Sequence, residues 1–127
     1  MTSFGTLKAD TLTHSTAGSL ATNFVVEGSA KAWIGWVYSS SDIVISDSFN
    51  ISGSTDTGTG DAQFSLSNAM GSSGGASAVA GSNHSATGNI LVDKDSASAF
   101  ANRLFNSSSA AEDSSGNFSM TIHGDLA

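Results

Sequence analysis

Apolar and polar residues alternate along several segments of this chain of 127 residues, and the most apolar of these segments runs from Lys31 to Tyr38. Successive side chains of an extended strand point to opposite faces, so this segment predicts a strand with two distinct faces. One face carries Trp33, Gly35 and Val37, and the other carries Ala32, Ile34, Trp36 and Tyr38. Because both faces are apolar, we expect the strand to be covered twice, by its own second sheet and by another protomer.

Other segments follow the same two-residue period. Asp42–Ser52 is predicted as a strand that places Ile43, Ile45 and Phe49 on one face. The glycine-containing segment Asp56–Asp61 predicts a hairpin that leads into Ala62–Leu66. Further strands are predicted over Thr6–Thr13, Ala76–Ala80, Asn89–Val92, Ala99–Phe105 and Phe118–His123. The segment Ser96–Phe105 is also compatible with one or two helical turns.

These elements predict an all-β fold, an antiparallel β-sandwich or jelly-roll-like module. We assign residues 30–127 to this module and residues 1–29 to an N-terminal arm and linker. Leu, Ile, Val and Phe make up only about a fifth of the chain, which predicts a thin core. Because ordering the backbone is costly, we expect additional burial against identical copies, in a homotrimer.

Charge and composition exclude several classes of function. The net charge is −7 and the basic residues are few and scattered, so no basic stripe is present for nucleic acid or an anionic membrane. Cysteine is absent, which removes disulfides, thiolate catalysis and Cys-based zinc sites. No apolar run approaches about 18 residues and no basic-plus-apolar leader is present, so we expect neither a transmembrane helix nor a conventional signal peptide.

The polar residues form no recognisable reactive constellation. His14, His84 and His123 lie in a linker, a Gly/Ser loop and the polar face of a strand, and no Gly-X-Ser-X-Gly elbow occurs. The aspartates do not form an EF-hand loop. We therefore expect no enzymatic activity and no cofactor. A metal ion on a trimer axis, bound by one Asp or His from each chain, stays open as an alternative.

Two interpretations fit the aromatic residues of the Lys31–Tyr38 segment. Their clustering in one strand favours a core or an interface between subunits, whereas an exposed aromatic face would suit stacking against a sugar. The residues assigned to the core or the oligomer interface are Trp33, Ile34, Trp36, Tyr38 and Phe49. Recognition is assigned to polar loops instead, because loops on rigid β scaffolds tolerate variation. The candidate loop residues are Asp56, Asp61, Asn83 and His84.

Short motifs in the middle of the chain carry a resemblance to a protein family. They are Ala32-Trp33-Ile34, Asp47-Ser48-Phe49-Asn50-Ile51-Ser52, Gly58-Thr59-Gly60-Asp61 and Asn68-Ala69-Met70. The chain resembles the C-terminal module of tail-fibre and related virion proteins of bacteriophages, especially marine ones. A lead similar to Lys8-Ala9-Asp10-Thr11-Leu12 precedes the module in those proteins, and a Gly-Asp similar to Gly124-Asp125 ends it.

This resemblance implies a structural protein on the surface of a phage particle, at the tip of a tail fibre or appendage, that takes part in host attachment. Its expected partners are further copies of itself, other virion proteins and a glycan on the host surface. Leu7 and Leu12 would belong to an arm that docks on a neighbouring chain. A capsid decoration (cement) protein is the second interpretation. A secreted carbohydrate-binding adhesin or ice-binding protein is the third.

Overall fold

The computed structural model describes residues 9–16, 18–22, 25, 28–39, 42–72, 74–83, 87–113 and 115–127. The all-β fold is confirmed, and the described residues form ten strands that pair in antiparallel fashion. The strands are β1 (Thr11–His14), β2 (Gly18–Ala21), β3 (Ala30–Ser39), β4 (Asp42–Phe49), β5 (Ile51–Gly58), β6 (Asp61–Leu66), β7 (Ser77–Ser82), β8 (Thr87–Lys94), β9 (Ala99–Asn106) and β10 (Asn117–His123).

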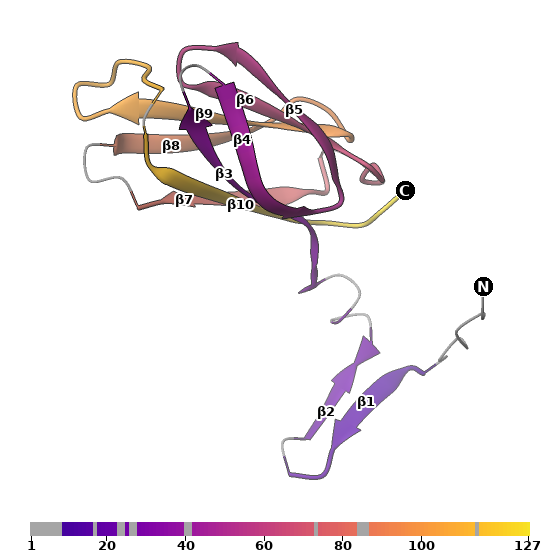
Figure 1. The fold of residues 1–127 in the computed structure, drawn as a ribbon. Coiled ribbons are helices and arrows are strands. Elements are labelled where there is room, and N and C mark those ends of the chain that lie inside the picture. Colours follow the sequence, from indigo (N-terminus) through magenta and orange to yellow (C-terminus); the bar gives the residue numbers. More distant parts are fainter. Residues whose placement is uncertain are drawn as a thin grey trace.

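Two four-stranded sheets pack as a sandwich (Figure 1). The β3 sheet has the strand order β4-β3-β10-β7, and the β6 sheet has the order β5-β6-β9-β8. β1 and β2 form a separate hairpin, which stands apart from the sandwich in Figure 1. The sequence did not predict β2, and β9 excludes the helical alternative for its segment.

The core lies between the two sheets and is built by alternate residues of their strands. Trp36 is fully buried, and its ring centroid lies 4.7 Å from that of Phe64 on the opposite sheet and 5.7 Å from that of Phe118 on β10. Ala32, Ile34, Trp36 and Tyr38, which the sequence placed together on one face of this strand, are all buried and form the inner face of β3. The other large core residues are Phe64, Leu66, Met70, Phe100, Leu104, Met120 and Ile122.

A β-bulge in β4 changes which residues face the core. The pairing of β4 with β3 shifts register at Ser46, which leaves one extra residue in β4. Beyond that residue the alternation is inverted, so Phe49 pairs with Trp33 and points away from the core, whereas Ile43 and Ile45 pack against it. The prediction that Phe49 shares a face with these isoleucines is therefore wrong. A simple two-residue period does not account for an inserted residue.

The chain passes from the β3 sheet to the β6 sheet at Asn50. This residue has a φ of 58°, a conformation that asparagine tolerates better than most residues. Its side-chain amide donates hydrogen bonds to the carbonyl oxygens of Lys31 (3.0 Å) and Asn68 (3.1 Å), and its Oδ1 accepts one from the Asn68 N–H (2.8 Å). The segment Asp42–Ser52, predicted as one strand, is therefore two strands in different sheets.

A hairpin forms within Asp56–Asp61 as predicted, but its turn is shorter than the predicted loop, since β5 extends to Gly58 and β6 begins at Asp61. Gly60 in this turn has a φ of 72°, and a Cβ built on it would lie 2.6 Å from the carbonyl oxygen of Leu104. No other residue type fits such a close approach without displacing the backbone. The turn is thereby fixed against β9.

We expect Trp36→Ala to lower the free energy of unfolding by about 3 to 5 kcal/mol, because it removes the largest side chain of the core and leaves a cavity between the sheets. Trp33→Ala is the matched control and should cost about 1 kcal/mol or less, because the Trp33 side chain is 38% exposed. Urea unfolding followed by circular dichroism measures both. Equal losses in the two variants would contradict the assignment of Trp36 as the core anchor.

Candidate functional site

Four residues in register form a row across the face of the β3 sheet that points away from the β6 sheet. Cross-strand pairing places Phe49 beside Trp33, Trp33 beside Thr121, and Thr121 beside Val79. The exposed fractions are 55% for Phe49, 38% for Trp33 and 70% for Val79. We call this face the outer face and these four residues the outer row. The row is an apolar ridge that the described part of the chain leaves in contact with solvent.

The adjacent row on the outer face has small and polar residues. Its cross-strand neighbours are Asp47, Gly35, Ser119 and Gly81. Neither glycine has a positive φ, and the nearest atom to a Cβ built on Gly81 is the Oγ of Ser119 at 3.8 Å. A side chain would therefore fit at Gly81 without strain. Its absence leaves open space beside the outer row.

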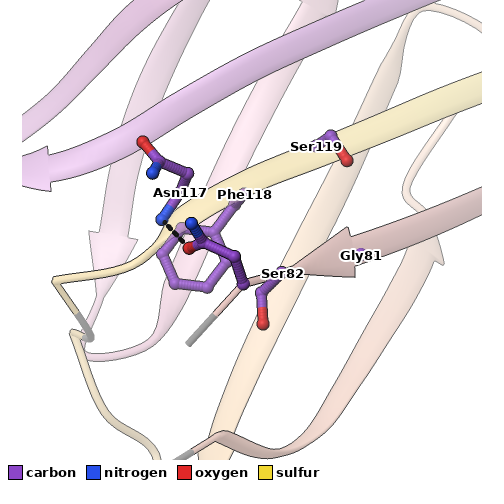
Figure 2. Close-up of a pocket in the computed structure, with 6 residues that line it drawn as sticks. Gly81, Ser82, Asn117, Phe118 and Ser119 are labelled. Atoms are coloured by element: carbon purple, nitrogen blue, oxygen red, sulfur yellow. Dashed lines mark hydrogen bonds between the residues drawn. The ribbon is translucent and has the colours of Figure 1, made fainter. Parts of the chain in front are cut away.

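A shallow cavity of about 380 Å³, widely open to solvent, lies at one end of the β7–β10 pair (Figure 2). Its lining residues are Gly81, Ser82, Asn83, Asn117, Phe118 and Ser119. The Asn117 N–H donates to Asn83 Oδ1 at 2.8 Å, and the Asn83 N–H donates to the Asn117 carbonyl at 3.1 Å, which fixes the two strand ends together. Among the described residues, none bonds to the hydroxyls of Ser82 and Ser119 or to the side-chain amide of Asn117. These groups are available to a ligand.

A second hollow of about 300 Å³ lies at the opposite end of the same strand pair. It is lined by Gly75, Ser77, His123, Gly124 and Asp125, and Ser77 and His123 are cross-strand partners. No hydrogen bond joins the side chains of Ser77, His123 and Asp125 to one another in the described structure. An acid–base triad requires such bonds to orient its histidine, so this hollow does not hold an assembled triad.

Tyr38 lies near an acidic end of the sandwich. Its ring packs edge-on against Phe118, with centroids 6.0 Å apart, and its buried hydroxyl has no hydrogen-bond partner among the described residues. Burial, together with the negative charges of Asp113, Asp56 and Asp61, raises the pKa of Tyr38 well above its ordinary range. The protonated phenol is thus the stable form in the folded protein. Within the described residues, no group of three or more His, Cys, Asp or Glu is placed to hold a metal ion.

The basic side chains that the structure describes are all engaged within the chain. Lys31 Nζ donates to Ser29 Oγ at 2.9 Å, and Lys94 Nζ donates to the Ala76 carbonyl at 2.7 Å. Arg103 forms ion pairs with Asp61 (3.4 Å) and Asp93 (3.0 Å) on the exposed face of the β6 sheet. Arg103 is thus paired with carboxylates, whereas Lys31 and Lys94 donate to neutral oxygens.

The structure separates the residues that the sequence grouped as core or interface. Ile34, Trp36 and Tyr38 lie in the core, whereas Trp33 and Phe49 lie exposed on the outer face. For Trp33 and Phe49 the role in an oligomer interface stays a prediction. The sequence missed the contribution of Thr121 and Val79 to this face, because only strand register brings these distant residues together.

The residues that the sequence assigned to recognition loops do not form one site in the structure. Asp56 and Asp61 flank the β5–β6 turn, where Asp56 Oδ1 accepts a hydrogen bond from the Gly58 N–H and Asp61 pairs with an arginine. Asn83 lines the larger cavity, far from that turn in the sequence. Leu12 is exposed on β1. Leu7 and His84 lie outside the described residues.

Comparisons with known proteins do not assign the chain to a family. No family model matches it, no curated protein matches it, and no solved structure matches it. Among the described residues, no helix has the length and apolar character needed to cross a membrane. A functional assignment therefore has to rest on the surfaces described above.

We expect the free energy of unfolding to fall as pH rises above about 10, because the tyrosine of the unfolded chain loses its proton there whereas folded Tyr38 retains it. This one group contributes a slope of at most about 1.4 kcal/mol per pH unit. Tyr38→Phe removes that contribution and leaves the slopes of the other groups. Urea unfolding of both proteins between about pH 9 and pH 11 measures the difference.

The titration itself has a direct readout, because Tyr38 is the only tyrosine in the chain. The ultraviolet absorbance of tyrosinate should appear at higher pH in the native protein than in protein held unfolded in urea. A native titration at the ordinary tyrosine pKa, or identical pH slopes for the wild type and Tyr38→Phe, would contradict the buried, neutral phenol.

Proposed function

We propose that this chain is a non-enzymatic structural protein of a bacteriophage virion, a tail-fibre or appendage module that contributes to host attachment. The β1–β2 hairpin is its docking arm, and the sandwich is the part presented to the outside. The sequence motifs from Ala32 to Met70 support this proposal through their resemblance to virion proteins. Its location would be the surface of the particle, and its partners would be further copies of the chain and other virion proteins.

One structural observation carries the proposal, namely an apolar pair on a hairpin that stands apart from the sandwich. Leu12 and Leu20 are cross-strand partners, and they are 42% and 47% exposed. An isolated two-stranded hairpin is only marginally stable in water, so it gains most from docking on another protein. Its strands also present backbone groups that can extend a neighbouring sheet. These properties suit an assembly arm.

A capsid decoration protein is the second candidate, because the same hairpin would anchor a sandwich to a capsid shell. A secreted carbohydrate-binding adhesin is the third, and the exposed aromatic residues of the outer row favour it. The three candidates differ in where the chain resides. A cryo-EM map of particles separates them. Density for the chain on the tail supports the first candidate and density on the capsid supports the second, whereas a chain that is absent from every particle supports the third.

We expect replacement of both leucines of the hairpin, Leu12→Thr with Leu20→Thr, to reduce incorporation into particles strongly. Threonine favours strands, so the hairpin is retained while its apolar contact is lost. The matched control is Thr13→Ala with Ser19→Ala, which removes the 2.9 Å hydroxyl contact of an adjacent cross-strand pair. Quantitative immunoblotting of purified particles gives the occupancy. Wild-type occupancy of the leucine double variant would overturn the docking role.

We also propose that the chain assembles as a homotrimer, because its own core is thin and it leaves apolar residues exposed outside the outer row and the hairpin, among them Leu91 and Leu126. Light scattering coupled to size exclusion at micromolar concentration should give three times the chain mass of 12.7 kDa. A folded protein that stays monomeric over the accessible concentration range would refute this assembly state.

A further inference from the structure

The outer face combines an aromatic ridge with hydrogen-bonding groups on both sides of it. Along β10, Ser119 lines the larger cavity, Thr121 belongs to the outer row, and His123 lines the second hollow. The outer row, which includes Trp33 and Phe49, therefore crosses the sheet at a position along β10 that lies between the larger cavity and the second hollow. A strand rises about 3.3 Å per residue, so these features follow one another within the reach of one elongated ligand.

The apolar ridge is narrow, because polar positions flank it on the same face. Asp47 and Ser119 lie in the next row on one side, and His123 and Ser77 lie on the other side. The core of a stable protein interface needs a broad apolar area, and an interface between two copies would also have to cover Asp47. A ligand that is apolar along one face and polar along its edges fits this pattern better. A sugar ring has this character, with C–H groups on its faces and hydroxyls around its rim.

Charge narrows the class of ligand further. Asp47 is the one charged side chain within the two rows and the larger cavity, and only one of its oxygens is engaged within the chain, accepting from the Ser48 N–H at 2.8 Å. Neither of the two rows contains a lysine or an arginine. A phosphate or sulfate group placed on these rows would therefore be repelled by Asp47, with no cation in the rows to offset it. A neutral ligand avoids this cost, and the carboxylate of Asp47 can accept hydrogen bonds from the hydroxyl groups of such a ligand.

We propose that the outer face of the β3 sheet binds a neutral polysaccharide, with sugar rings stacked on Trp33 and Phe49 and with Asn117 and Ser119 as hydrogen-bonding groups in the adjoining cavity. The negative face of an aromatic ring attracts the partly positive C–H groups of a sugar, and the contact removes apolar surface from water. This inference deepens the proposed function, on which it rests for its biological setting.

Gly81 supplies the sharpest test, because a side chain fits there. Glycine in a strand interior is destabilising unless something approaches its backbone closely, and the space above Gly81 is open. Gly81→Val should therefore fold at least as stably as the wild type and should fill the cavity beside Ser119. Gly53→Val is the matched control, because Gly53 lies on β5 of the other sheet and likewise has open space around its Cβ position.

The experiment measures binding of the purified full-length chain to neutral polysaccharides such as glucans, galactans and mannans, by affinity electrophoresis and by isothermal titration of their oligosaccharides. We expect at least one of them to bind, and Trp33→Ala and Gly81→Val each to weaken that binding by about tenfold or more, the size expected for losing an aromatic anchor or blocking its pocket. Gly53→Val should bind as the wild type does. Thermal melts of each variant show that it is folded.

Several outcomes would overturn the inference. They are the absence of binding to every neutral polysaccharide tested, binding restricted to phosphorylated or sulfated glycans, and wild-type affinity in the folded variant Gly81→Val. Dissociation of an oligomer by Trp33→Ala, with no change in sugar binding, would show that a second copy covers the face. Particle incorporation is measured separately through Leu12 and Leu20, so the virion assignment and the sugar site can fail independently.

Discussion

The contact between Trp36 and Phe64 across the two sheets holds the sandwich together. A sandwich is stable only if the inner faces of its sheets exclude water, and this chain has few large apolar residues with which to do so. Trp36 compensates by packing on Phe64 of the opposite sheet and on Phe118 of the neighbouring strand at once. One indole thereby connects three strands, and the remaining core residues extend this contact along the strands.

The composition of the outer face follows from two irregularities next to this core. The extra residue at Ser46 turns Phe49 outward beside Trp33, and Asn50 then redirects the chain into the second sheet. The side chain of Asn50 is bonded to Lys31 and Asn68, which are distant in sequence, so the corner is fixed by tertiary contacts. Without the bulge, Phe49 would have joined the core and Trp33 would have had no aromatic neighbour.

Sequence periodicity predicted the strands well because alternation reflects burial on one face, which is a local property. It placed Ala32, Ile34, Trp36 and Tyr38 together correctly. It could not detect the bulge at Ser46, since an inserted polar residue among serines leaves no distinct signal. Among the residues of the outer face and its cavity, the sequence singled out Trp33, Phe49 and Asn83, although it did not place all three in one site. The row itself is a product of register among four strands, which single-chain patterns do not encode.

The exposed apolar residues are informative because the core is so thin. A chain with many apolar residues can leave some of them exposed to solvent at little cost in stability, and apolar residues scattered singly over a surface do not indicate a binding site. Here Phe49, Trp33 and Val79 are in register on one face, although each would have strengthened the core had it pointed inward. Leu12 and Leu20 repeat this arrangement on the hairpin. The two surfaces belong to separate sheets of the molecule, so a substitution on one of them need not alter the other.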